Sequence, residues 1–201
     1  MANKKNIKCI IFDVGGVLLK EKIDKVHDAI NKELGKKVFD RKDAIHRKAV
    51  LGKLTEKELF RILSKKYGVH AKRLQALSHD KYLKIVKTNK DVMMIAKTLQ
   101  KDYKTCILSN VTPMHKKHDH VMEIYSFFDH VVLSCDIGAM KPNKKIFKEA
   151  MKKLHAKPKE CIYIEDREEF LETPKKLGMN VIHFKNAAQL KKDLRKNGVK
   201  I

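Results

Sequence analysis

The sequence predicts an α/β fold in which a parallel sheet carries helices on both faces and an all-helical segment is inserted. A short apolar run at 9–12, near the N-terminus, is typical of a strand buried on both faces. About seventy residues of helical periodicity follow it directly. Beyond them, short β-rich runs alternate with amphipathic stretches, which is the pattern of parallel strands joined by right-handed helical crossovers.

Length and composition indicate one globular unit. A chain of 201 residues with 43% hydrophobic content can bury a sizeable core and a small inserted module. No stretch approaches the ~18 apolar residues of a membrane span. The N-terminus superficially imitates a signal peptide, but Asp13 interrupts its apolar part and no small-residue cleavage site follows. We therefore expect a cytoplasmic monomer or homodimer with no membrane partner.

The cysteines support the same location. They stand at positions 9, 106, 135 and 161, so no pair has the spacing of a CxxC site, and three lie in apolar, strand-like runs. Such residues are typical of free thiols in the core of a protein from a reducing compartment.

The formal net charge of +22 comes from 46 basic and 24 acidic residues and attracts anions, including phosphorylated metabolites and nucleic acid. The lysines are spread along the whole chain, however, few aromatic residues alternate with them, and no nucleic-acid-binding motif is visible. We interpret most of this charge as solvated surface, with nucleic acid kept as an alternative partner.

The first predicted strand ends in a carboxylate, Asp13, followed closely by Gly15 and Gly16. In open α/β sheets ligands bind at the carboxyl ends of the strands, and glycines let the backbone turn tightly and approach a ligand. An aspartate after a strand can also be only a turn or a helix cap. The residues at the other predicted strand ends distinguish a ligand-binding carboxylate from a turn or cap.

The inserted segment carries four predicted helices, at 23–34, 41–50, 55–68 and 71–86. Gly35 suits the end of the first, and Thr55 with Glu58 forms a capping box that opens the third. We place a helical cap at 20–88, with its hinge at 20–22, and an α/β core at 1–19 and 89–201.

The α/β pattern then resumes. Strands are predicted at 105–108, 131–133, 161–164 and 181–184, and helices at 91–100 and 143–154. A last crossover helix is expected to begin with Thr173 as its N-cap, because Pro174 is tolerated in a first helical turn.

Polar side chains stand at three of these strand ends, namely Asp13, Ser109–Asn110 and Glu165–Asp166. Because the strands are parallel, these ends meet at one edge of the sheet, where Lys141 from the loop 138–142 can join them. Such a set suits phosphoryl transfer.

Each residue type has a role in that chemistry. Asp13 would attack phosphorus and form an aspartyl-phosphate, and Asp13 with Asp166 would hold Mg²⁺. The Ser109 hydroxyl and the Lys141 ammonium would hold the phosphoryl oxygens. We add Gly16, as a point of close backbone approach, and Asn110, as a polar group at a strand end, to the predicted phosphate-binding residues.

Four segments, FDVGGVL, ILSN, GAMKPNKKIF and YIED, resemble in this order the motifs of the haloacid dehalogenase (HAD) superfamily. The resemblance covers essentially the whole chain and extends to the cap-bearing branch of small-metabolite phosphatases, such as sugar-phosphate phosphatases. It implies a Rossmann-like core, Asp13 as nucleophile, and Lys141 as a catalytic residue that binds phosphate. It also adds the main-chain carbonyl of Gly15 and the carboxylate of Glu165, directly or through a water, to the Mg²⁺ ligands.

The chain departs from the family pattern in two places. Most of these phosphatases carry an acid-base aspartate where this chain has Gly15, and such a group is worth roughly 10²–10⁴-fold in rate. Glu21, Asp24 and the cap histidines are candidate replacements. Phe170 stands where relatives commonly have asparagine.

The resulting hypothesis is a Mg²⁺-dependent phosphatase that acts on a small phosphorylated metabolite, with sugar phosphates leading. One alternative is a dehalogenase-type hydrolase, in which Asp13 attacks carbon without Mg²⁺. Another is a non-catalytic or nucleic-acid-binding protein of the same fold. We also expect an exposed loop at 115–120, with a structural zinc site as the alternative, and core positions for Met93 and Met94.

Overall fold

The predicted α/β fold is confirmed by the computed structural model, which describes residues 6–201, with the backbone alone at 119 and 120. Among the described residues, one sheet holds five parallel strands in the order β3-β2-β1-β4-β5. They are β1 (Cys9–Phe12), β2 (Lys104–Ser109), β3 (His130–Leu133), β4 (Cys161–Glu165) and β5 (Asn180–His183). In register, Ile10 of the central strand lies between Thr105 and Ile162.

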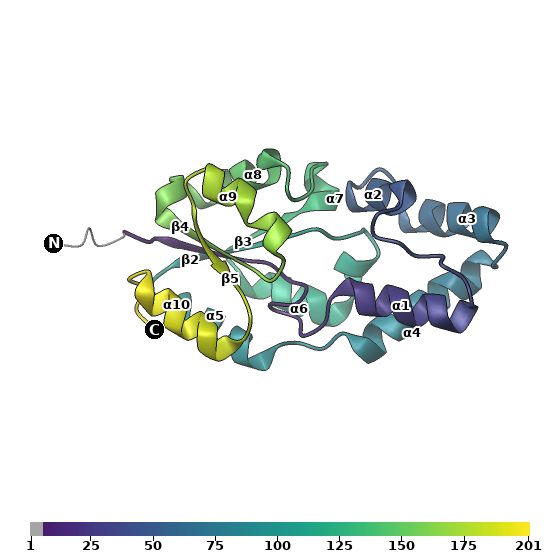
Figure 1. Cartoon of the computed structure of the whole chain (residues 1–201), viewed down its shortest axis with the longest axis horizontal. Helices are drawn as coiled ribbons and strands as arrows, with labels where there is room; N and C mark the ends of the chain where they lie inside the picture. The colour runs from purple at the N-terminus through teal and green to yellow at the C-terminus, as the bar shows by residue number, and fades with distance from the viewer. Residues whose placement is uncertain (1–5) are drawn as a thin grey trace.

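Helices cover both faces of this sheet (Figure 1). On one face α5 (Lys90–Leu99) and α10 (Ala187–Lys196) pack against Ile10 and Phe12. On the other, α8 (Lys144–Leu154) and α9 (Glu172–Lys176) cover Cys9 and Ile11. The α-helix α6 (Asp119–Phe127), the short helix α7 (Ser134–Ile137) and the 3₁₀ turns η1 (His115–Lys117), η2 (Pro158–Glu160) and η3 (Glu168–Phe170) complete the core. Strand side chains point alternately to two apolar layers, and all four residues of β1 are buried.

The inserted helices are α1 (Ile23–Leu34), α2 (Ala44–Val50), α3 (Glu56–Tyr67) and α4 (Ala71–Ile85), and they form the end of the molecule remote from the chain termini (Figure 1). Gly35 ends α1 in the left-handed conformation, and the Thr55–Glu58 capping box opens α3, both as predicted. Helix α2 begins later than predicted because the Asp43 carboxylate caps it, accepting a hydrogen bond of 2.7 Å from the Ile45 amide.

Two linkers connect this inserted segment to the sheet, and they run side by side. Leu19 and Thr88 form an antiparallel bridge. The Lys20 amide donates to the Lys87 carbonyl at 2.9 Å, and the Asn89 amide donates to the Leu18 carbonyl at 2.8 Å. The inserted helices therefore leave and re-enter the core at one point.

Two predictions about the core helices are wrong. Helix α9 begins at Glu172, so Thr173 lies inside it rather than at its N-cap. The preceding 3₁₀ turn leads the chain into the helix, and Pro174 still falls among the first helical residues, whose amides need no intrahelical acceptor. Met94 is exposed on α5, whereas Met93 packs against the core as expected.

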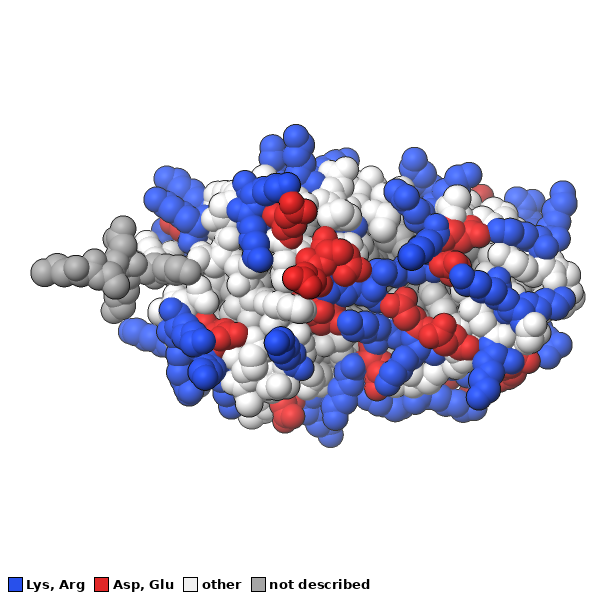
Figure 2. Space-filling view, viewed as in Figure 1, with Lys and Arg blue, Asp and Glu red and all other residues white. Residues whose placement is uncertain are grey.

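The cysteines and the surface agree with the sequence. Cys9, Cys106 and Cys161 are buried free thiols, and Cys135 is half-buried. Figure 2 shows lysine and arginine over the whole of the displayed face, interspersed with acidic groups rather than gathered in one patch. Within the described part of the chain, no helix has both the length and the apolar character that crossing a bilayer requires.

Candidate active site

The carboxyl edge of the sheet gathers residues that lie far apart in the sequence. Asp13 directly follows β1, Ser109 ends β2, and Glu165 ends β4 with Asp166 next to it. Lys141 reaches them from the loop between α7 and α8. The structure thus brings together at one edge the strand-end residues that the parallel topology placed there.

Lys141 lies at the centre of this group and is only 1% exposed. Its Nζ donates to Asp13 Oδ1 and to Glu165 Oε2, both at 2.7 Å. The rings of Phe170 and Tyr163 lie 5.2 and 5.8 Å from the same nitrogen. Burial alone would lower the pKa of Lys141, but the two carboxylates outweigh it and raise the pKa, so the side chain is a cation.

Asn110 holds the loop that carries this lysine. Its Oδ1 accepts from the Lys141 amide at 2.8 Å, and its Nδ2 donates to the Lys141 carbonyl at 3.2 Å. The Asn110 side chain is therefore occupied by the Lys141 main chain. These bonds hold the lysine loop, and because Asn110 also lines the pocket, its contact with phosphate stays a prediction.

Asp13 is buried at the foot of the site, and its amide donates to the Ile164 carbonyl at 2.9 Å. Burial, with the negative charge of Glu165, raises the pKa of Asp13 to about 7 against the opposing effect of Lys141. A cation beside this carboxyl would favour its ionised form.

Three hydrogen-bond donors fix the Glu165 carboxylate. Its carboxylate accepts from Lys141, from the Tyr163 hydroxyl and, at 3.1 Å, from the Arg167 amide. Burial raises the pKa of Glu165, but Lys141 and Tyr163 outweigh burial and lower the pKa to about 2. This side chain is therefore an anion at any ordinary pH.

Asp166 has a free oxygen. Its Oδ2 pairs with Lys22 Nζ, whereas its Oδ1 is buried and accepts no hydrogen bond from any residue that the structure describes. Gly16 packs directly on this carboxylate: a Cβ at that position would lie 2.4 Å from Oδ2, and its φ is +82°. Only glycine leaves room for Asp166 in this position.

A divalent cation fits these residues. Oxygens of Asp13, Glu165 and Asp166 lie within 4.8 Å of one another, and no other cluster in the described residues offers a comparable set of ligands. Three carboxylates face two ammonium groups, from Lys141 and Lys22, so negative charge is left uncompensated. Hard carboxylate oxygens, one of them without a partner, are typical Mg²⁺ ligands.

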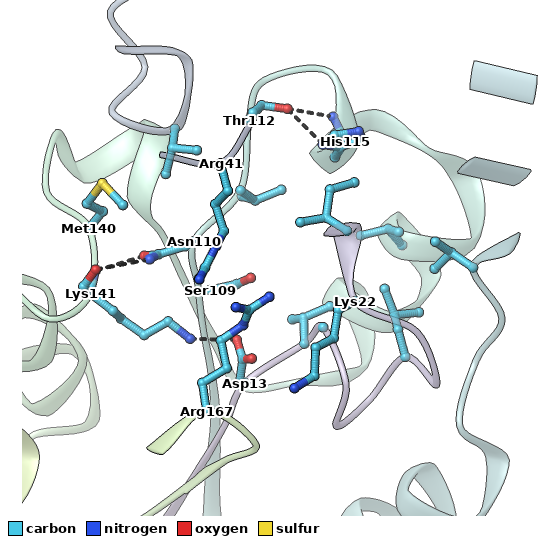
Figure 3. Close-up of a pocket in the computed structure, with 18 of the residues that line it drawn as sticks. Asp13, Lys22, Arg41, Ser109, Asn110, Thr112, His115, Met140, Lys141 and Arg167 are labelled. Carbon is cyan, nitrogen blue, oxygen red and sulfur yellow. Dashed lines mark hydrogen bonds and ion pairs between the residues drawn. The ribbon is translucent and has the colours of Figure 1, made fainter. Parts of the chain in front are cut away.

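A pocket opens over this edge (Figure 3). Asp13, Gly15, Ser109 and Lys141 line its floor, and Ser109 is 5% exposed. Figure 3 shows Lys22, Arg41 and Arg167 directed at the space around Asp13. Of these three, the sequence identified Lys22 only as part of a hinge. Arg167 directly follows Asp166 in the sequence, and this position could have identified it as a residue of the site.

The arginines at the pocket are held by carboxylates. Arg167 pairs with Asp24, and Arg41 contacts Asp24 at 3.7 Å and Glu169 at 3.4 Å. Asp24, a candidate replacement for the acid-base group, is therefore occupied, and its pKa is lowered because Arg167 and Arg41 outweigh its burial.

Two of the other candidates for that role, Glu21 and His46, line the pocket, whereas the remaining cap histidines, His27, His70 and His79, do not. Glu21 does so while it pairs with Lys25 at 2.5 Å, and His46 does so with a pKa that burial lowers to about 4. The position of the missing acid-base group is open: a Cβ on Gly15 would meet no atom within 4 Å.

The predicted exposed loop at 115–120 is wrong for two of its histidines. His115 and His118 are buried, and both rings stack against Tyr82 from α4, at centroid distances of 4.8 and 4.3 Å. These stacked rings form a contact between the inserted helix α4 and the core. The side chain of His120 lies outside the described residues.

Residues 7–178 match the haloacid dehalogenase-like hydrolase family. A glyceraldehyde 3-phosphate phosphatase of Pyrococcus furiosus is 35% identical over 95 residues, which are 46% of this chain and 39% of the relative. A flavin mononucleotide hydrolase of Arabidopsis thaliana is 29% identical over 80 residues, 40% of this chain and 33% of the relative. The matches thus span well under half the length of these curated relatives.

Solved structures extend the likeness over the whole fold. A predicted HAD-like family hydrolase from Porphyromonas gingivalis superimposes with a TM-score of 0.77 at 25% identity, over 95% of this chain and 98% of that one. A HAD family enzyme from Bacteroides thetaiotaomicron, solved with magnesium and inorganic phosphate, gives a TM-score of 0.72 at 23% identity, over 89% and 94% of the two chains.

Proposed function

We propose that this chain, which belongs to the haloacid dehalogenase-like hydrolase family, is a Mg²⁺-dependent phosphatase of small phosphorylated metabolites. One observation carries the proposal: a buried lysine joins two carboxylates at the sheet edge, and a third carboxylate beside them has a free oxygen. The names of the phosphatase relatives and the Mg²⁺- and phosphate-bound neighbour support it.

In the first half-reaction, an Asp13 carboxylate oxygen attacks phosphorus and the bond from phosphorus to the ester oxygen breaks. The products are an aspartyl-phosphate and the alcohol, whose oxygen takes up a proton. Lys141 and the Ser109 hydroxyl lie at the pocket floor, where they would balance the charge of the phosphoryl oxygens. Splitting the transfer in this way replaces one hard step by two easier ones.

In the second half-reaction, water attacks phosphorus, the bond to Asp13 breaks, and inorganic phosphate leaves. Gly15 offers no side chain to activate that water. Glu21 and His46 are the pocket-lining groups from the inserted helices and their linker that could take or give the proton.

The metal ligands are proposed from the same group of residues. Asp13 and Asp166 would hold Mg²⁺ with the main-chain carbonyl of Gly15, and Glu165 would act through a water, because its oxygens are already engaged by Lys141, Tyr163 and the Arg167 amide. When bound, the ion supplies positive charge that lets ionised carboxylates and a phosphate dianion share one site.

The inserted helices are proposed to act as a cap, with domain bounds at 20–88 and at 1–19 with 89–201. They rest on the core through specific contacts. The Ser134 hydroxyl donates to the Val50 carbonyl at 2.7 Å, and a Cβ on Gly52 would lie 2.0 Å from the Cys135 carbonyl oxygen. A cap held so closely over the pocket would exclude bulk water from the reaction.

The test is phosphate release from a panel of phosphate monoesters with Mg²⁺. Asp13→Asn should abolish release, whereas Asp102→Asn, a matched change at an exposed aspartate, should keep it. EDTA should stop the reaction and added Mg²⁺ should restore it. Release that EDTA does not change, or that Asp13→Asn retains, would refute the proposal. Halide release from 2-haloacids without metal would favour the dehalogenase alternative instead.

A further inference from the structure

The pocket over Asp13 has a charged end and an apolar end. Lys22, Arg41, Lys141 and Arg167 are directed at the space around Asp13, whereas Thr112 and His115 lie at the opposite end (Figure 3). We call this opposite end the apolar chamber. It is lined by side chains of α2, α4 and α6 and of the segments that follow α4 and β2, namely Val50, Tyr82, Val86, Val111, Val121 and Tyr125.

The polar groups in the chamber are mostly used within the protein. Thr112 Oγ1 and His115 Nδ1 hydrogen-bond each other at 3.0 Å, and the His115 ring stacks on Tyr82. Burial lowers the pKa of His115 well below its usual value, so the ring is neutral. The described side chains named here as lining the chamber therefore carry no charge.

Among the described residues that line the chamber, Tyr125 has a side-chain polar atom left for a ligand. The Tyr125 hydroxyl is buried and has no hydrogen-bond partner among the described residues. The Tyr125 side chain is 7% exposed and lines the pocket. A buried hydroxyl without a partner is energetically disfavoured, so a ligand that offers it a hydrogen-bonding atom would bind more tightly.

We infer that the organic part of the substrate is an apolar alkyl or aryl group, with at most one polar atom that reaches Tyr125. This inference rests on the proposed phosphatase function and replaces the expected sugar phosphate by a different substrate class. A sugar brings several hydroxyls, and those that do not reach Tyr125 would lose their water without gaining a partner in the chamber. An apolar group instead gains free energy in proportion to the apolar area that it removes from water.

The first test compares four substrates with Mg²⁺. We expect kcat/KM for n-hexyl phosphate and phenyl phosphate to exceed that for glyceraldehyde 3-phosphate and glucose 6-phosphate by ~10-fold or more. Equal or higher values for the two sugar phosphates would overturn the inference and leave the proposed function standing. Phosphate release from none of the four would contradict the proposed function itself.

The second test changes the chamber wall. Val121→Thr replaces one methyl group of a buried side chain by a hydroxyl of similar size. This variant should raise KM for n-hexyl phosphate by ~10-fold, while inhibition by inorganic phosphate stays unchanged. Met122→Thr is the matched control, because Met122 is the next residue of α6 and is exposed. Val50→Thr, from α2, repeats the test if the first variant does not fold. Equal KM values in the chamber variants and the control would refute the inference.

Discussion

Gly16→Ala tests whether Asp166 holds the metal in the position that the structure gives it. The new Cβ would lie 2.4 Å from Asp166 Oδ2 and 2.7 Å from its Cγ, so the carboxylate must move by about 1 Å to regain ordinary contact. Displacing a ligand or its support typically weakens metal affinity by about 10–100-fold. The φ of +82° adds ~1 kcal/mol of backbone strain for alanine.

The measurement is Mg²⁺ titration of the metal-free protein by calorimetry and, in parallel, of its phosphatase activity. Gly68→Ala is the control, because its φ of +67° imposes the same kind of backbone strain but its Cβ would meet nothing within 4 Å. We expect the Mg²⁺ dissociation constant to rise by about 10–100-fold in Gly16→Ala only. An unchanged constant in Gly16→Ala would refute the reasoning.

Two further predictions concern the inserted helices. Gly52→Ala should weaken their contact with the core and lower both activity and thermal stability, because the new Cβ meets the Cys135 carbonyl. Gly35→Ala is the control, because its φ is similar but its Cβ would meet no atom within 4 Å. Equal melting temperatures of the two variants would contradict this prediction. Burial lowers the pKa of His27 to about 3, so the unfolded chain binds a proton below pH ~6.5 that the folded chain does not, and stability falls as the pH falls. Urea unfolding measures this effect: between pH 7 and pH 5 the free energy of unfolding should fall by about 2 kcal/mol more in the wild type than in His27→Phe. An equal fall in both proteins would contradict the assignment.

Much of the fold was predictable because its signals are local. The apolar run before Asp13 and the one before Glu165 have the length and composition of buried parallel strands, and both are strands in the structure. Once those strands are parallel, the topology alone brings their carboxyl ends together. The closeness of Asp13 to Asp166 thus followed from the strand pattern.

The remaining features depend on contacts that no local pattern records. Lys22 pairs with Asp166 only because the linker folds back over the sheet edge, and the Asn110 side chain bonds the main chain of Lys141 as well as lining the pocket. The burial of His115 and His118 likewise needs Tyr82, which comes from a helix that precedes them by more than thirty residues. Sequence patterning assigns such polar runs to solvent because their partner is remote.

The central claim, that Asp13 forms a covalent bond to phosphorus, can be measured directly. Protein mixed with a turned-over phosphate ester and Mg²⁺, then quenched in acid, should yield a peptide in which Asp13 carries one phosphoryl group by mass spectrometry. Hydrolysis in ¹⁸O-water should place the label in the released phosphate and none in the carboxylate. Label in the Asp13 carboxylate, or turnover without any phosphorylated peptide, would contradict the account.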